Sequence, residues 1–215
     1  MHVVVDHFDL YWHGFAKTLG ICLWAGTGAL VLGTLLAAFR VSPVPPLRWT
    51  GTAYVTLVRN CPLTVVLFFV AFGLPEVGVR QSYYRFAVGG LIVYTAAFVC
   101  EAVRSGINAV PNGQAEAARA IGLDFRQTLG SIVLPQAFRT VVPPLGNVWI
   151  ALAKNTSIAA GFAVTDLAAA LQRLANQNAD QLLTVFLAIV AAYLVITLPS
   201  AWLIGVIERR TAILR

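Results

Sequence analysis

The stretch that decides the fold runs from Glu101 to Pro135 and reads EAVRSGINAVPNGQAEAARAIGLDFRQTLGSIVLP. It lies between two strongly apolar blocks and is the longest run rich in charged residues, glycine and small side chains. Pro111-Asn112-Gly113 ends the preceding helix, and the alanine-rich segment 114–121 favours a new one. Gly122 then supplies the left-handed residue that commonly follows a helix C-terminus.

A second short helix is predicted directly after this glycine. Asp124 can cap its N-terminus, and Gln127, three residues later, completes a capping box. The sequence therefore predicts a helix-turn-helix between two membrane spans. Because the first of these helices is rich in alanine, its side chains are short and another protein can approach it closely.

The spacing of these residues resembles the EAA loop of ABC importer permeases. The pattern consists of Glu116-Ala117-Ala118, then Gly122, then Ile132-x-Leu134-Pro135. A lone Glu-Ala-Ala would indicate an ordinary helix. The glycine, the Leu-Pro pair and the flanking apolar blocks all stand in register, and this combination favours the family.

The resemblance implies an all-α integral membrane protein with the MetI-like fold of type I ABC importers. It also implies that the loop docks into a groove on a cytoplasmic ABC ATPase dimer and transmits the closure of that dimer to the membrane helices. The coupling residues implied in this sequence are Glu116, Ala117, Ala118, Gly122, Asp124 and Phe125.

Composition indicates a membrane protein independently of the motif. Of the 215 residues, 59% are hydrophobic and only 11% are charged, which is far more apolar than a soluble domain. About 20 apolar residues cross a bilayer, so we predict a single transmembrane domain over 1–215. The expected spans are 17–39, 56–74, 86–104, 141–164 and 182–207, with the coupling loop at about 109–139. Glycines in the first span predict close helix packing.

The distribution of basic residues predicts the orientation. A net charge of +6 is compatible with nucleic-acid binding, but the arginines lie between apolar blocks and form no single patch. The positive-inside rule accounts for them with the N-terminus outside and the C-terminus in the cytoplasm of a bacterial cell. The cytoplasmic set is then Arg40, Arg48, Arg59, Arg104, Arg119, Arg126, Arg139, Arg209, Arg210 and Arg215, and the external set is Lys17, Arg80, Arg85 and Arg173.

Several polar residues fall within or beside the predicted spans, where they are expensive unless they face protein or water. Arg59 is either an anchor at the cytoplasmic end of its span or part of a cavity lining. Glu101 and Arg104 are three residues apart and can form a structural ion pair on one helix face.

The tetrad Lys154-Asn155-Thr156-Ser157 interrupts the fourth span. We expect it to line a cavity, because Lys154 needs water or a partner. The alternative is that Thr156 and Ser157 bond to their own helix backbone. The substrate-cavity candidates are therefore Arg59, Lys154, Asn155, Thr156 and Ser157.

Motifs that the sequence lacks exclude other classes. It has no Gly-x-x-x-x-Gly-Lys-Ser/Thr phosphate cradle, no zinc-protease motif and no nucleophile elbow. We therefore expect no enzyme activity, no bound cofactor and no metal in this chain, with ATP-Mg held by the partner ATPase. Five spans are few to enclose a solute route, so a second permease subunit, identical or homologous, is expected. A channel or scaffold subunit unrelated to ABC transport, or a membrane-embedded enzyme, are the competing classes.

A further resemblance concerns the substrate. Arg59-Asn60-Cys61-Pro62-Leu63, followed by Phe68-Phe69 and Phe72-Gly73-Leu74, is similar to polar amino-acid permeases, as is the Lys154–Ser157 tetrad. The segment Arg40-Val41-Ser42-Pro43-Val44 and the EAA region are most similar to actinobacterial glutamate permeases. The resemblance implies alternating-access import of a polar amino acid, with glutamate expected, delivered by an extracytoplasmic binding protein. Relatives have Asp at the position of Asn155, where a cationic substrate would gain a partner, so its absence favours an acidic or neutral substrate. The alternative to glutamate is the same importer with a basic or neutral amino acid as its substrate.

Overall fold

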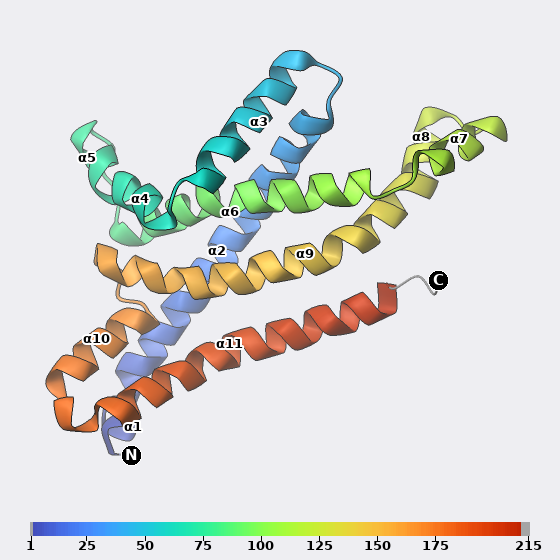
Figure 1. Ribbon diagram of the computed structural model, residues 1–215. Coiled ribbons are helices and arrows are strands. Elements are labelled where there is room, and N and C mark those ends of the chain that lie inside the picture. The colour runs from blue at the N-terminus through green and yellow to red at the C-terminus, as the bar shows by residue number, and fades with distance from the viewer. Residues whose placement is uncertain (1, 212–215) are drawn as a thin grey trace.

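The computed structural model of the chain describes residues 2–211, and the regular elements within this range are helical. Arg215, which the sequence assigns to the cytoplasmic set, lies outside the described residues. Four long helices form the frame of the molecule (Figure 1): α2 (Phe8–Val41), α6 (Tyr83–Asn108), α9 (Leu134–Asn155) and α11 (Leu182–Thr211). The shorter elements are α1 (His2–Asp6), α3 (Pro45–Asn60), α4 (Leu63–Phe68), η1 (Phe69–Gly73), α5 (Leu74–Glu76), α7 (Asn112–Ala120), α8 (Phe125–Gln127), η2 (Thr128–Val133), η3 (Thr156–Phe162), α10 (Leu167–Gln177) and η4 (Ala179–Gln181).

Small residues set the distance between α2 and α6, which form the most extensive helix pair. A Cβ atom on Gly33 would lie 2.6 Å from Val99, and one on Gly28 would lie 2.5 Å from Ile92. Both distances are too short for real atoms, so the two backbones approach closely only because these positions lack side chains. The close packing predicted for the glycines of the first span is therefore present.

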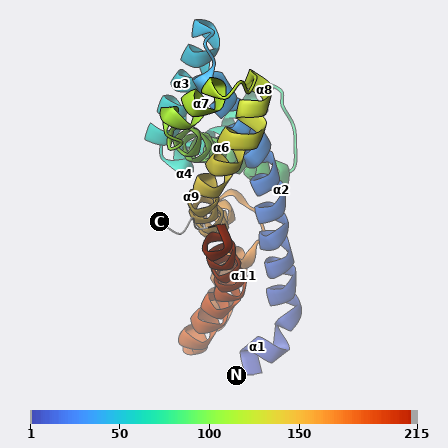
Figure 2. The ribbon, with the colours of Figure 1, turned by 90° about the vertical axis from the view of Figure 1, so that its right-hand side faces the viewer.

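Helices α9 and α11 extend this packing on the other side of α6. Figure 2 shows α9 and α11 along one side of the molecule and α2 along the other. A Cβ atom on Gly106 of α6 would lie 2.1 Å from Val141 of α9, and one on Gly146 of α9 would lie 2.4 Å from Ile204 of α11. Glycine thus lies at all three of these crossings, α2 with α6, α6 with α9, and α9 with α11.

The second predicted span is bent. Helix α3 ends at Asn60, and the following helical segment, from Leu63 to Glu76, leaves at an angle of 103°. Cys61 and Pro62 have extended backbones between the two segments. Proline lacks an N–H donor and disfavours the helical region for the residue before it, so Cys61-Pro62 breaks the helix. The predicted span 56–74 therefore contains the end of α3, this break and α4.

The helix that contains the start of the fourth predicted span, 141–164, begins before residue 141. Helix α9 starts at Leu134 and continues through Pro143 and Pro144 without interruption. The irregular part follows the helix: a 3₁₀ segment from Thr156 to Phe162, and then Ala163 with a left-handed φ of 58°. Backbone of this kind within a membrane protein is tolerated where it is buried in protein or lines a cavity.

Three of the described helices are long and apolar enough to cross a membrane, and the number rises to five if each of two bent helix pairs counts as one crossing. Helix α11 shows how such a crossing meets its surroundings. Leu183 and Trp202 on this helix are mostly exposed, as are many of its other large apolar side chains. Lipid, rather than water, is the suitable neighbour for such a surface.

Candidate functional site

Two regions contain the residues to which the sequence assigns functions. The first is the turn formed by α7 and α8, which lies at the ends of α6 and α9 away from α10 and α1 (Figure 1). The second lies along α6, between Tyr94 and Arg104, where α2, α3 and α9 approach it.

The turn after α7 is fixed by a Schellman motif. Gly122 has a φ of +89°, its N–H donates to the carbonyl of Arg119 at 3.0 Å, and the N–H of Leu123 donates to the carbonyl of Ala118 at 3.1 Å. In this motif the left-handed residue, Gly122, stands four positions after Ala118, the residue whose carbonyl accepts from Leu123. The spacing between Ala118 and Gly122 therefore has a backbone cause.

The capping box predicted for α8 is present. Oδ1 of Asp124 accepts from the N–H of Gln127 at 2.8 Å, and Oε1 of Gln127 accepts from the N–H of Asp124 at 3.0 Å. The two motifs leave Phe125 and Ile121 projecting from the turn, with exposed fractions of 77% and 80%. A rigid polar turn that carries exposed apolar side chains is suited to contact with another protein.

The other coupling candidates divide by exposure. Glu116, Ala117, Gly122 and Asp124 are exposed, whereas Ala118 is buried. Ala118 therefore packs within the turn, and the exposed face of α7 is carried by Glu116 and Ala117. Just beyond α8, η2 is a π-helical segment of six residues that leads into α9. Such segments are frequent at functional sites.

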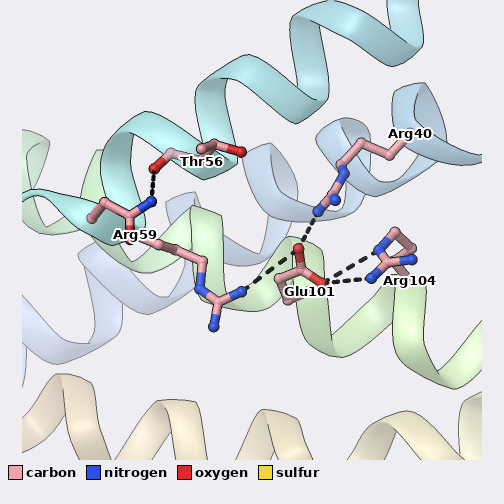
Figure 3. A network of polar contacts seen from close by, with 6 residues as sticks. Arg40, Thr56, Arg59, Glu101 and Arg104 are labelled. Atoms are coloured by element: carbon pink, nitrogen blue, oxygen red, sulfur yellow. Dashed lines mark hydrogen bonds and ion pairs between the residues drawn. The ribbon is translucent and has the colours of Figure 1, made fainter.

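The second region is organised around Glu101. Three arginines from three helices surround its carboxylate: Arg40 at the end of α2, Arg59 near the end of α3, and Arg104 on α6 itself (Figure 3). The Glu101–Arg104 pair that the spacing predicts is present, with Nη2 of Arg104 3.0 Å from Oε2. Three guanidinium groups face a single carboxylate, so this part of the molecule has an excess of positive charge.

The three arginines are not equivalent. Arg40 makes the closest contact with Oε1, and its side chain is the least exposed of the three. Arg104 donates two hydrogen bonds to Oε2, from Nε and Nη2. Arg59 shares Oε1 with Arg40 at a longer distance, 3.6 Å, and its side chain is 45% exposed. Arg40 and Arg104 therefore fix Glu101, and Arg59 is the weakly held member.

Arg59 also borders a cleft. Its guanidinium carbon lies 5.4 Å from the centre of the Phe98 ring, within range of a cation–π interaction. Phe98, Tyr94 and Asn155 line a cleft of about 350 Å³ between α6 and α9, together with Thr95, Asn147, Val148, Ala151 and Leu152. Of the predicted cavity residues, Asn155 lines this cleft, whereas Arg59 is not among the lining residues and contacts only the Phe98 ring at its border.

The remaining residues of the tetrad lie elsewhere. Lys154 and Ser157 line a separate groove against α11. Thr156 is fully buried, and its hydroxyl donates to the carbonyl of Ala153 at 2.8 Å. Ser157 donates to the carbonyl of Lys154 at 2.7 Å. Both hydroxyl groups are therefore satisfied by their own helix, which was the alternative interpretation of these two residues.

Sequence reasoning missed Arg40 and Phe98 as members of this region. The sequence assigns Arg40 only to the set of cytoplasmic charges, and it presents Phe98 as one apolar residue of a span among many. The one available signal was the position of Arg40 at the end of a span, since such residues can reach a charged partner on a neighbouring helix.

The comparisons with known proteins agree with this architecture. Residues 29–213 match the model of a protein family described as the inner membrane component of binding-protein-dependent transport systems. The chain belongs to this family. The permease is 41% identical over 211 residues to the glutamate transport system permease protein GluC of Corynebacterium glutamicum, with 93% of this chain and 92% of the relative covered. It is 38% identical over 208 residues to the probable glutamine permease protein GlnM of Bacillus subtilis, with 97% and 96% covered.

Solved structures share the fold. The structure of an amino acid ABC transporter with histidines has a TM-score of 0.89 at 28% identity, with 96% of each chain covered. The inward-facing methionine transporter MetNI has a TM-score of 0.76 at 21% identity, with 97% of this chain and 99% of the other covered, and this likeness concerns the fold alone. The predicted MetI-like, all-helical fold is therefore confirmed.

The permease is accordingly a multi-pass inner-membrane component of an ABC importer for amino acids. It is not an enzyme, since ATP hydrolysis in such importers belongs to a separate subunit. The predicted class is confirmed, and the channel or scaffold and membrane-enzyme alternatives are wrong. Its partners include an ATPase and a binding protein.

Proposed function

We propose that the permease imports L-glutamate by alternating access. The observation that carries the substrate is the 41% identity to a glutamate permease over nearly the whole chain. The excess of positive charge around Glu101, next to the cleft that contains Asn155, supports an acidic solute. Asn155 would leave a cationic substrate without a partner at that position.

The proposal includes the orientation and the partners. The N-terminus lies outside and the turn of α7 and α8 lies in the cytoplasm, where Glu116, Ala117, Ala118, Gly122, Asp124 and Phe125 meet one subunit of an ATPase dimer. ATP and Mg²⁺ bind to that dimer. A second permease subunit, identical or homologous, completes the solute route, and lipid surrounds the pair.

A second candidate substrate is glutamine. It is favoured by the 38% identity to a probable glutamine permease, with a slightly larger share of this chain covered. Glutamate and glutamine have similar shapes and differ in the charge of the side-chain end group, so charge near the cleft is the physical basis for discrimination.

Competition for uptake tests the proposal. The permease is purified with its partners, reconstituted in vesicles and supplied with ATP and binding protein, and labelled glutamate uptake is measured with unlabelled glutamine, aspartate, arginine or histidine added. The proposal expects aspartate to compete more strongly than arginine or histidine. Competition mainly by glutamine would replace the substrate by a neutral one, and competition by arginine or histidine would replace it by a basic one.

A further inference from the structure

A second hollow adjoins the cleft at the α6–α9 pair. It has a volume of about 360 Å³ and is walled by α2, α6, α9 and α11, whereas the residues that line the cleft belong to α6 and α9 alone. We call it the four-helix groove; each of the four helices contributes to its wall, for example with Gly26, Val99, Gly146 and Ile204. Thr95, Val148 and Leu152 line both hollows, so a single layer of side chains separates the groove from the cleft.

The wall of the four-helix groove is almost entirely apolar. Nε1 of Trp149 donates to Oγ of Ser200 at 3.2 Å, and this hydroxyl donates to the carbonyl of Ile196 at 2.7 Å, so these polar groups are satisfied within the protein. The indole packs so close to α2 that a Cβ atom on Gly26 would lie 2.4 Å from its ring. The exception is Thr95, in the layer shared with the cleft, whose hydroxyl has no partner among residues 2–211. A polar solute would gain little from such a wall, whereas a hydrocarbon chain is suited to it.

The position and length of the groove match one leaflet of a bilayer. Its helices belong to the candidate membrane spans, and its rim residues Leu30 on α2 and Leu203 on α11 are both partly exposed. Along α9 its lining extends from Val142 to Leu152, ten positions later, which at 1.5 Å per residue is about 15 Å. Half of a hydrocarbon core about 30 Å thick is also about 15 Å. An acyl chain of membrane lipid therefore has the chemistry and the length of the groove.

One end of the groove has an arginine without a partner. Phe138 and Arg139 stand one turn before Val142 on α9, at the end that lies beside the turn of α7 and α8 (Figure 1). Residues three and four positions apart share a helix face, so both continue the face that Val142 and Gly146 present to the groove. Arg139 is exposed and forms no ion pair with any of residues 2–211. An aromatic and a basic residue at the end of an apolar face are typical of the membrane interface.

Helix α11 adds positive charge at the same end. The bond between Trp149 and Ser200 and the close approach of Gly146 to Ile204 show that α9 and α11 are antiparallel. The C-terminal end of α11, with the sequence Glu208-Arg209-Arg210, therefore lies at the level of the start of α9. Basic residues outnumber acidic ones there, which complements an anion rather than a neutral group.

We infer that the four-helix groove binds one acyl chain of an anionic phospholipid whose phosphate group is held by Arg139. A guanidinium offers two parallel N–H donors to phosphate oxygens. In the proposed orientation this end faces the cytoplasmic leaflet, where anionic lipids are concentrated. The second permease subunit would lie on the side of the cleft, because it completes the solute route, and this leaves the groove to lipid.

A bound chain would support the solute cleft from behind. Thr95, Val148 and Leu152 would have the acyl chain on one side and the cleft on the other. The lipid is thus a structural ligand of the permease and not a transported solute. The inference does not depend on which amino acid is transported, so its failure would leave the substrate proposal standing.

Native mass spectrometry of the purified permease–ATPase complex tests the inference. The complex is delipidated in detergent and titrated with phosphatidylglycerol or phosphatidylcholine that have the same oleoyl chains, and the Kd of the tightest-bound lipid is measured. Arg139→Gln removes the inferred phosphate ligand, and Arg48→Gln is its matched control, because Arg48 is an exposed arginine on α3, which contributes nothing to the wall. Leu30→Trp fills the groove, and Val31→Trp is its control, because Val31 is the next residue of α2, is mostly exposed and does not line the groove.

The wild-type complex is expected to bind phosphatidylglycerol more tightly than phosphatidylcholine. Arg139→Gln should raise the Kd for phosphatidylglycerol about fivefold, the usual effect of one basic residue near an anionic lipid, and Arg48→Gln should leave it unchanged. Leu30→Trp should raise the Kd for both lipids tenfold or more, because each methylene group kept out of an apolar site lowers the affinity roughly fourfold. Val31→Trp should bind both lipids as the wild type does. Thermal unfolding shows which variants are folded, and Leu203→Trp, which fills the groove from α11, replaces Leu30→Trp if that variant does not fold.

Three results would overturn the inference. An unchanged Kd in folded Arg139→Gln, or an equal loss in Arg48→Gln, would show that Arg139 does not hold the phosphate. Equal binding by the folded groove-filling variant and Val31→Trp would place the lipid elsewhere, and the groove would then be covered by another occupant such as the second permease subunit. Weak binding of both lipids without preference would show an adventitious lipid belt only.

Discussion

Replacement of Gly122 by alanine isolates the backbone requirement of the turn between α7 and α8. A Cβ atom at this position would have no neighbour within 4 Å, so a steric clash contributes nothing. The φ of +89° remains, and a left-handed backbone costs an L-residue roughly 1–2 kcal/mol. The lower entropy of alanine in the unfolded chain offsets about 0.4–1 kcal/mol of this. The net cost is about 1 kcal/mol, equivalent to roughly a fivefold change in an equilibrium constant.

The chain offers a matched control for this substitution. Gly78, in the turn after α5, also has a φ of +89°, and a Cβ atom there would likewise have no neighbour within 4 Å. Gly122→Ala and Gly78→Ala therefore carry the same backbone strain at different sites, and both should lower the thermal unfolding temperature of the complex by a similar small amount.

The assay compares transport with ATP hydrolysis. The number of amino-acid molecules accumulated per ATP hydrolysed is measured in vesicles for the wild type and both variants. We expect Gly122→Ala to lower this ratio up to about fivefold, because the strained turn spends less time in the shape that meets the ATPase. Gly78→Ala should leave the ratio unchanged. Equal ratios for the two variants would refute the coupling role of the turn.

Three further predictions concern packing and charge. Glu101→Gln leaves three partly buried arginines without a carboxylate and should destabilise the complex by roughly 2 kcal/mol, whereas Arg40→Gln should cost less, because Arg104 still pairs with Glu101. Urea titration of the detergent-solubilised complex measures both free energies of unfolding, and equal costs would contradict this reasoning. Gly106→Ala places a Cβ atom 2.1 Å from Val141 and should lower the stability measured by thermal unfolding by about 1–3 kcal/mol. Adding Val141→Ala should restore part of this stability, and no recovery would show that the contact between α6 and α9 is not the cause of the loss. Oδ1 of Asp166 caps α10, while its Oδ2 has no hydrogen-bond partner among residues 2–211, so Asp166→Asn should destabilise the protein less than Asp166→Ala. A lower melting temperature for the Asn variant than for the Ala variant would contradict this.

Local patterns in the sequence were sufficient for the turn. The left-handed Gly122 and the capping box of Asp124 and Gln127 depend on residues within a few positions of one another, and both are present. The pair of Glu101 and Arg104 is local in the same sense. Backbone geometry at short range is what residue type and spacing determine most directly.

Contacts between distant segments could not be predicted in this way. Arg40 meets Glu101 across 61 positions of sequence, and this contact depends on how α2 crosses α6. The sequence predicts a span over 56–74, but neither the bend of 103° within it nor the packing of α3 on α6 that brings Arg59 to Phe98. The tetrad from Lys154 to Ser157 was predicted to line one cavity, whereas the ends of α9 and η3 distribute its members among a cleft, a groove and the core.

The most direct test of the central claim is the energy dependence of uptake by the wild-type permease. The purified complex is reconstituted in vesicles, and labelled glutamate accumulation is followed with ATP and binding protein, without ATP, and without binding protein. We predict accumulation against the concentration gradient only when both are present. Accumulation that continues without ATP, or none of any polar amino acid with both supplied, would contradict the assignment of this chain to an ATP-driven amino-acid importer.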